Sequence, residues 1–507
     1  MLLINSSPKN ALKIFQPFLP IFIPVGVGSL ASYFMSKGVT IDIADEQVAD
    51  DMLSKVENYA QKAQGRLIFG FSALTASLDS ALGLSKTIKD KYPDACIIFG
   101  GIHPTAMPEE ILAYQHIDFV VRGEGEMPLF ELYAALKEGR DPEGIKSLSF
   151  RKNGLIVHND MLTATLELDD LPEFPYHLFL DKRYDLGFVV SSRGCPYNCI
   201  FCSNRIPTGK KYRFVKPEKT AATLEMLNQK YGVSFVLFLD DNFLVHKPRV
   251  YELIDEIKKR GLHEKMTFSF QARGDNTSEK LLRDLFAVGF RSVFFGMETS
   301  SEEIMKTIRK GETVKECVDA VNLAKKIGFH VSATFIFGLP GETHEDRIKA
   351  IELAKELRLD QVRFNNATPY PGTELHDIAV ASNRLYVDGV YKNFLSVGTF
   401  IESPFHPIPF SYLPPDSTER EIRNDILLAY LAFYLNFSKL KEIFFKPKQG
   451  SGWFNAGEDL LQLFKKIPSL AFLFLNISVK FLKLFADIFF SGSSKIRSRD
   501  LMRLMKN

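Results

Sequence analysis

The sequence predicts an α/β protein with two consecutive parallel-sheet domains and a mainly helical C-terminal region. Short apolar runs alternate with helix-compatible segments over residues 1–140, and the alternation returns over residues 185–375. Residues 376–507 do not show this alternation, and their pattern predicts a mainly helical region. Because alternating strands and helices form βαβ units, each alternating stretch is expected to form one parallel sheet.

The first domain is expected to contain five strands. They are residues 2–5, 40–44, 66–71, 95–101 and 117–121. Five such strands make a Rossmann-like open sheet, with ligands at the carboxyl ends of the strands. Residues 141–184 differ, because Asn153-Gly154 between apolar runs favours a hairpin and Pro172 and Pro175 mark a linker.

The second domain is expected to contain six strands. They are residues 187–192, 235–240, 267–272, 292–297, 331–338 and 361–366. Six β/α units in series indicate a barrel or a barrel-like open sheet. Polar motifs follow these strands, at the ends where parallel α/β folds place their sites.

The composition narrows the function classes. Hydrophobic residues make up 46% of the 507 residues and charged residues 24%, as in a globular protein. A net charge of +2 gives no basic field that would favour nucleic acid as a partner. Five cysteines are too few for a disulfide scaffold, and the first ten residues lack the order of a signal peptide. A cytoplasmic location is therefore expected.

Three of the five cysteines lie within eight residues, in Cys195-Pro-Tyr-Asn-Cys199-Ile-Phe-Cys202. Three thiolates on one loop suit a metal centre. Cys96 and Cys317 sit in apolar strand and helix patterns, which favours buried core positions. A structural zinc would need a fourth ligand, for which His177 and His246 are the nearest candidates.

The CxxxCxxC spacing, with the aromatic Phe201 before the last cysteine, resembles the radical S-adenosylmethionine (SAM) superfamily. The resemblance implies that Cys195, Cys199 and Cys202 hold a [4Fe-4S] cluster whose open iron binds SAM. It also implies a partial (β/α)₆ barrel, reductive cleavage of SAM to a 5′-deoxyadenosyl radical, and a cofactor-binding role for Phe201.

The strand-end motifs of the second domain resemble the SAM contacts of that family. The resemblance implies contacts to the SAM amino group, its carboxylate and its adenine, at Asp240, Asp241, Asn242, Arg273, Glu298 and Gly338. Helix N-caps at Asp241 or Asn242, or an ordinary ion pair of Arg273 or Glu298, are the alternatives. Tyr370, after the sixth strand, is the candidate catalytic residue.

The whole series resembles the subgroup of this family with an N-terminal cobalamin (B12)-binding domain. Three loops of the first domain resemble the cobalamin-facing loops, and their candidate residues are Ser72, Thr75, Gly100, Gly101, His103, Gly123, Glu124 and Gly125. The motif Asp-x-His-x-x-Gly is absent, so the lower axial ligand of cobalt is not identified. A domain that binds nothing, with His103 only capping a turn, is the alternative.

Residues 468–490 are densely apolar, and basic residues follow them. Such a segment can lie in a membrane interface or pack as a helix on the barrel. The substrate is expected to be a small molecule, and membrane contact would indicate that it is lipid-like. No stretch is long and apolar enough to be expected to span a membrane.

The function expected from the resemblance is that of a cobalamin-dependent radical SAM enzyme that methylates an unactivated carbon. The cofactors would be a [4Fe-4S] cluster, SAM and cobalamin, with a reductant such as flavodoxin or ferredoxin. Cyclisation, ring rearrangement or oxidation without methyl transfer is the first alternative. A non-catalytic iron-sulfur electron-transfer or regulatory protein is the second.

Overall fold

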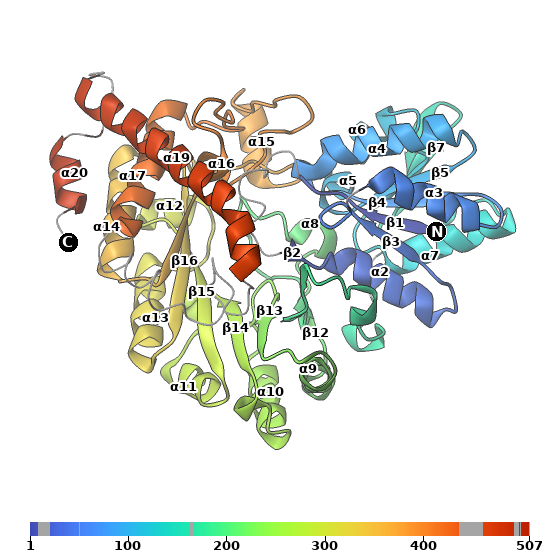
Figure 1. The fold of residues 1–507 in the computed structure, drawn as a ribbon, viewed down its shortest axis with the longest axis horizontal. Coiled ribbons are helices and arrows are strands. Elements are labelled where there is room, and N and C mark those ends of the chain that lie inside the picture. The colour runs from blue at the N-terminus through green and yellow to red at the C-terminus, as the bar shows by residue number, and fades with distance from the viewer. Residues whose placement is uncertain are drawn as a thin grey trace.

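The computed structural model describes residues 1–8, 21–49, 51–162, 166–435, 460–490, 496 and 498–505. In Figure 1 the first domain lies on the right in blue and cyan, and the second lies on the left in green and yellow. The C-terminal helices, in orange and red, lie over the second domain. Part of the basic tail, Lys495, Arg497 and Lys506, lies outside the described residues.

The first sheet has the strand order β3-β1-β4-β5-β6-β7-β8. Its first five strands are parallel: Asp42–Asp45 (β3), Leu2–Asn5 (β1), Ile68–Ser72 (β4), Cys96–Gly100 (β5) and Phe119–Val121 (β6). The order reverses between β1 and β4, which is the switch point where doubly wound folds bind ligands. Most positions of these strands are buried, which explains their nearly continuous apolar runs.

Helices cover both faces of this sheet. Val25–Ser36 (α2) and Glu126–Glu138 (α7) pack on one face. The other face carries Met52–Lys62 (α3), Leu78–Lys91 (α4) and Pro108–Ala113 (α6). Two short helices lie in the loops after β4 and β5, Thr75–Ser77 (η2) and Ile102–Ala106 (α5).

A hairpin extends the first sheet. Leu148–Lys152 (β7) pairs with β6 and with Leu155–His158 (β8), both times antiparallel. Asn153 and Gly154 turn between them with φ of 51° and 80°, the left-handed backbone that a two-residue turn of this type requires. The sequence placed the hairpin with the linker, whereas the structure joins it to the first sheet, because β6 offers an unpaired edge.

The second sheet is an open, parallel partial barrel of six strands. They are Phe188–Val189 (β10), Phe235–Phe238 (β13), Thr267–Ala272 (β14), Phe290–Glu298 (β15), His330–Phe337 (β16) and Gln361–Asn366 (β17), in that order. The first strand is shorter than the sequence indicates. The chain leaves the sheet after Val189, and Ser192–Arg193 (β11) instead pairs antiparallel with Arg213–Phe214 (β12).

Helices alternate with the barrel strands. They are Arg205–Thr208 (α8), Pro217–Tyr231 (α9), Lys247–Lys259 (α10), Glu279–Ala287 (α11), Glu302–Thr307 (α12), Val314–Ile327 (α13), His344–Glu356 (α14) and Glu374–Ala381 (α15). The shorter elements are Ile21–Phe22 (β2), Tyr184–Asp185 (β9), Leu168–Asp170 (η3), Tyr176–Leu178 (η4), Leu262–Glu264 (η5) and Gly274–Asn276 (η6). A large apolar cluster joins the barrel strands to these helices and to the C-terminal region.

The C-terminal region is mainly helical, as expected. Its helices are Gly398–Ile401 (α16), Glu419–Tyr434 (α17), Leu460–Phe490 (α19) and Ser498–Met505 (α20). Helix α17 covers the edge strand β17, and α19 packs on α16 and α17. Among the described residues, no helix has the length and apolarity needed to cross a membrane.

Candidate active site

The cysteine loop lies between β11 and α8. Cys195, Cys199 and Cys202 are partly buried, and all three are free thiols. The backbone of Ile200 anchors the loop, because its N–H donates to the Ile308 carbonyl at 3.1 Å and its carbonyl accepts from the Leu375 N–H at 2.9 Å. The loop is therefore fixed by segments that follow β15 and β17.

The three thiols fit the donor set of an iron-sulfur cluster. Burial raises the pKa of all three, that of Cys202 to about 11, so thiolates here need positive charge nearby. Lys310 and Arg273 supply this positive charge, which partly offsets the effect of burial on the pKa of Cys199. Within the described ranges, no three His, Cys, Asp or Glu side chains could hold one ion together. A cubane does not require such convergence, because each cysteine binds a different iron.

The candidate zinc ligands do not join the cysteines. His177 is exposed on η4. His246 precedes α10 and uses its Nδ1 to accept from the Arg249 N–H at 3.1 Å. Phe201, beside the last cysteine, is partly buried against the barrel core.

Asp240 holds the turn that precedes the cysteine loop. Its side chain is fully buried. Its Oδ1 accepts from the backbone N–H groups of Ser191 at 2.7 Å and Ser192 at 3.0 Å, and its Oδ2 accepts from Arg249 Nη2 at 3.1 Å. These bonds explain why the chain leaves the sheet after Val189. With both oxygens engaged, Asp240 has little capacity to bind an ammonium group.

Asp241 brackets the cysteine loop. It accepts from the Gly194 N–H at 3.1 Å and from Asn204 Nδ2 at 2.9 Å, one residue before the first cysteine and two after the last. Burial raises its pKa. The neighbouring Asn242 is buried, and its Nδ2 has no hydrogen-bond partner among the described residues. An unpaired buried donor at a strand end is what a ligand acceptor would satisfy.

Arg273 lies against the cysteine loop. Its guanidinium stacks on the Tyr197 ring, 3.5 Å from the ring centroid. It also forks onto Asp275, with Nε at 3.0 Å and Nη2 at 2.9 Å from the two oxygens, and its Nη1 donates to the Lys310 carbonyl at 2.5 Å. The ion pair that the sequence left as an alternative is present, and the cation lies beside Cys195 and Cys199.

Glu298 points to a buried lysine that sequence reasoning missed. Lys310 Nζ lies 2.8 Å from Glu298 Oε1 and 3.6 Å from Glu312 Oε1. Glu298 itself has a left-handed φ of 62°. A Cβ at Gly296 would lie 2.3 Å from Glu298 Oε1 and 2.6 Å from Lys310 Nζ, so a larger residue there would displace the pair. The charged run Arg309-Lys310-Gly-Glu312 after α12 was the available signal.

Gly338 and Tyr370 follow β16 and β17. Gly338 is buried with φ of +87°. Tyr370 is partly buried against the core of the first domain, with its ring 6.5 Å from that of Phe394. A Cβ at Gly372, two residues on, would lie 2.9 Å from Ile206 and 3.0 Å from Ala106. Tyr370 thus stands in a turn where the two domains meet.

Two of the cobalamin-loop segments lie beside the switch point. Ser72 ends β4 opposite Gly100, which ends β5. Gly101 has φ of +105°, and a Cβ there would lie 2.7 Å from the Ala73 carbonyl, so the two loops touch. Leu74, between them and η2, is 51% exposed.

Thr75 and His103 face inward. Thr75 Oγ1 lies 3.2 Å from His103 Nδ1, and both residues are buried. Burial lowers the pKa of His103 to about 4. Its Nε2 has no hydrogen-bond partner among the described residues, and the Tyr391 ring covers the imidazole at 4.8 Å between centroids.

The third loop touches the barrel. Gly123 has φ of +75°, and Gly125 precedes α7. Glu124 Oε1 lies 2.5 Å from Arg213 Nη2 and 3.6 Å from Arg193 Nη1. Arg193 precedes Gly194 and Cys195, so this loop contacts the β11–β12 hairpin that leads into the cysteine loop.

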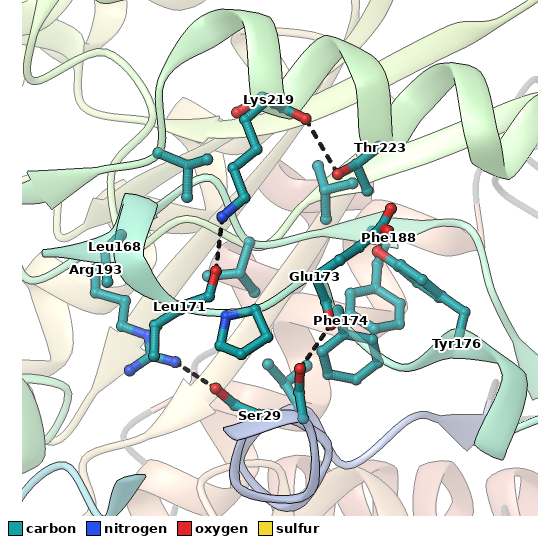
Figure 2. A pocket seen from close by; sticks show the side chains of 17 residues that line it. Ser29, Leu168, Leu171, Glu173, Phe174, Tyr176, Phe188, Arg193, Lys219 and Thr223 are labelled. Atoms are coloured by element: carbon teal, nitrogen blue, oxygen red, sulfur yellow. Dashed lines mark hydrogen bonds between the residues drawn. The ribbon is translucent and has the colours of Figure 1, made fainter. Parts of the chain in front are cut away.

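Glu126 and Ser29 complete this contact, which we call the interdomain clamp (Ser29, Glu124, Glu126, Arg193 and Arg213). Arg193 Nη2 lies 2.8 Å from both Glu126 Oε1 and Ser29 Oγ. Figure 2 shows Arg193 and Ser29 pointing toward each other at a pocket between α2, residues 168–176 and α9. None of the three cluster cysteines lines this pocket, so it lies apart from the strand-end site.

Comparisons with known proteins identify the family of the chain. The model of the radical SAM superfamily matches residues 189–354, and the model of the B12 binding domain matches residues 15–132. The chain is 32% identical over 428 residues to the uncharacterized methyltransferase PH0819 of Pyrococcus horikoshii, covering 83% of this chain and 90% of that protein. It is 25% identical to the anaerobic magnesium-protoporphyrin IX monomethyl ester cyclase of Rubrivivax gelatinosus, covering 84% and 76%.

A solved structure shares the fold. The radical SAM methyltransferase TsrM from Kitasatospora setae, with cobalamin and a [4Fe-4S] cluster bound, superposes with a TM-score of 0.63. The identity is 20%, and the match covers 75% of this chain and 74% of that chain.

Proposed function

Since the chain belongs to the radical SAM superfamily and to its subgroup with a B12-binding domain, we propose that it is a cobalamin-dependent methyltransferase that acts on an unactivated carbon. The observation that carries the proposal is the match to a methyltransferase relative along 83% of the chain, with three free cysteines on the barrel loop. The cofactors are a [4Fe-4S] cluster, SAM and cobalamin. A radical SAM enzyme acts on a small molecule and needs a reductant, for which flavodoxin or ferredoxin is proposed.

The protein's own residues bind and orient these groups. When bound, the cluster and SAM supply hydrogen abstraction, and cobalamin supplies the methyl group. We assign Cys195, Cys199 and Cys202 to the cluster, and Lys310 and Arg273 offset the negative charge of the thiolates. For SAM we keep two strand-end residues. The amide Nδ2 of Asn242 has no partner among the described residues and can donate to SAM, and Gly338 lets the backbone approach adenine closely.

The remaining assignments are proposed roles. Asp240, Asp241 and Glu298 hold the loops and the lysine that surround SAM. Ser72, Gly100 and Gly101 form the cobalamin edge of the first sheet, and Thr75 and His103 support it from within. Tyr370 is kept as a candidate catalytic residue, because its turn lies between the two domains.

Anaerobic reconstitution tests the function. The protein is loaded with iron, sulfide and cobalamin, mixed with SAM and a strong reductant, and its SAM products are quantified by mass spectrometry. Both 5′-deoxyadenosine and S-adenosylhomocysteine are expected, and Cys199→Ala should lose both because the cluster loses a ligand. If the loaded protein gives neither product, the enzymatic reading fails in favour of an electron-transfer or regulatory role.

A cyclase is the second candidate, because the chain also resembles the cyclase of Rubrivivax gelatinosus over 84% of its length. Such an enzyme would abstract hydrogen without transferring a methyl group. With a turned-over substrate, 5′-deoxyadenosine without S-adenosylhomocysteine would favour it over the methyltransferase.

We also propose peripheral membrane contact through α19 and a lipid-like substrate. Phe474, Leu475, Leu482, Phe489 and Phe490 on this helix are between 55% and 88% exposed. Large apolar side chains in that number favour a lipid interface. In a flotation assay with anionic liposomes, the protein should rise with the vesicles. The double variant Leu482→Ser/Phe490→Ser should reduce the fraction of protein that floats. Leu155→Ser, an exposed leucine of the first domain, is the control. Wild-type protein that stays at the bottom would contradict the contact.

A further inference from the structure

The loop after β16 is closed by an internal hydrogen bond. The N–H of Gly338 donates to Glu342 Oε2 at 2.5 Å. Glu342 is only 3% exposed, so this bond forms away from water. Because Gly338 has a left-handed φ of +87°, the loop has a conformation that other residues adopt at a cost, and Glu342 holds it there.

A chain of buried ionisable side chains connects Glu342, whose pKa burial raises to about 8, to the C-terminal region. Arg347 Nη1 lies 3.6 Å from Glu342 Oε2, and its Nε donates to Asp425 Oδ2 at 2.6 Å. His344 Nδ1 lies 3.0 Å from the same Asp425 oxygen. Arg347 and Asp425 are at most 1% exposed. Charges buried this deeply depend on one another, so removing Asp425 would leave the Arg347 cation without its nearest partner.

The same helix also touches the loop through an apolar side chain. Ile422 lies one turn before Asp425 on α17. Its Cδ1 would lie 3.1 Å from a Cβ at Gly338, and its Cγ2 3.8 Å. Helix α17 therefore reaches the Gly338 loop by two independent routes, one steric and one ionic.

We propose that Asp425 and Ile422 are positioning residues for SAM, and that α17 fixes the Gly338 loop in the shape that receives the adenine. The inference rests on the proposed function, in which the Gly338 segment binds SAM. It assigns the C-terminal region a part in SAM binding, although that region lies outside both matched family segments. The side chains themselves do not touch the ligand; they act through Glu342 and Gly338.

Equilibrium dialysis of SAM against the cluster-loaded protein tests this role. Asp425→Asn keeps the size of the side chain and removes its charge, and it should weaken SAM binding roughly tenfold, as the loss of a charge-assisted bond would. Ile422→Ala should weaken it as well. The KM for SAM should rise while kcat at saturating SAM stays, and the iron content should remain near that of the wild type. The melting temperature of both variants should fall, because both side chains are buried.

Arg420→Gln is the matched control. Arg420 stands on α17 too, but its exposed side chain pairs with Asp487 of α19 at 2.9 and 2.6 Å. SAM affinities of Asp425→Asn and Ile422→Ala within about twofold of the wild type would overturn the inference. If Asp425→Asn does not fold, Ile422→Ala decides alone. A wild-type protein that binds no SAM would instead refute the proposed function and, with it, this inference.

Discussion

Hydrogen bonding decides what each candidate residue can do. Asp240 and Glu124 were expected to contact cofactors, yet the first bonds Ser191, Ser192 and Arg249, and the second pairs with barrel arginines. A carboxylate whose lone pairs already accept protein donors has little left for a ligand. Asn242 differs from these two carboxylates, because its buried Nδ2 has no hydrogen-bond partner among the described residues.

His103 should make the stability of the first domain depend on pH. Burial lowers its pKa from 6.5 to about 4, so the folded state keeps it neutral while the unfolded state takes up a proton below pH 6.5. The free energy of unfolding should therefore fall as the pH falls from 6.5 towards 4, by up to about 1.4 kcal/mol per pH unit from this group. Urea denaturation at several pH values measures it.

The control for this effect is His103→Gln, which removes the titrating group and keeps a polar side chain near Thr75. Its stability should fall less steeply over the same pH range. Equal slopes for the wild type and the variant would show that His103 does not titrate differently in the two states.

At the scale of elements, α17 completes the partial barrel. The open sheet ends at β17, whose outer edge would otherwise expose unpaired backbone groups. The hydroxyl of Tyr434 accepts from the Val362 N–H at 3.0 Å and donates to its carbonyl at 2.8 Å, and the hydroxyl of Tyr430 accepts from the Phe364 N–H at 3.2 Å. Two tyrosines of one helix thus replace the missing neighbour strand.

Tyr434→Phe should lower the stability of the barrel. Both polar groups of Val362 would lose their partner while staying covered by the ring, which costs about 1–3 kcal/mol per unsatisfied group. Thermal unfolding of the variant should begin at a lower temperature. Tyr386→Phe is the control, because that side chain is 44% exposed and removing its hydroxyl leaves no buried group without a partner. An unchanged transition for Tyr434→Phe would contradict the edge-covering role.

At the scale of the whole molecule, the interdomain clamp fixes the position of the first domain relative to the second. Glu126 on the first domain and Arg193 on the second are mostly buried, with side chains 7% and 18% exposed. Burial opposes ionisation of Glu126, but Arg193 and Ser29 outweigh it, so its pKa is lowered. Because Arg193 stands two residues before Cys195, the clamp ties the position of the cysteine loop to the cobalamin-binding domain.

Glu126→Gln should loosen this contact. Removing one member of a buried ion pair costs about 3–5 kcal/mol, reduced here because Glu124 remains near Arg193. Hydrogen exchange of the β11–β12 hairpin amides should become at least about tenfold faster. Glu138→Gln is the matched control, since Glu138 ends the same helix and pairs with Arg140 at the surface, where both side chains are exposed. Exchange equal to that of the wild type would contradict the clamp.

Much of the fold followed from local pattern. The apolar runs at residues 66–71 and 267–272 gave strands β4 and β14 because buried parallel strands need nearly continuous apolar sequence. The first barrel strand was overestimated, because its shortening depends on Asp240, which lies far along the chain. Lys310 was missed for a similar reason: the charged run around it marks the segment, but its place beside Cys199 depends on residues distant in sequence.

The sequence by itself determined the alternation of strands and helices, the spacing of the three cysteines and the family to which these belong, because periodicity and short-range spacing are properties of the chain alone. Only the tertiary structure decided which charges are paired. Arg193 with Glu126, Lys310 with Glu298 and Arg347 with Asp425 join segments distant in sequence. Their partners are fixed by the packing of the domains and of α17, since buried charges must be matched wherever the fold brings them together.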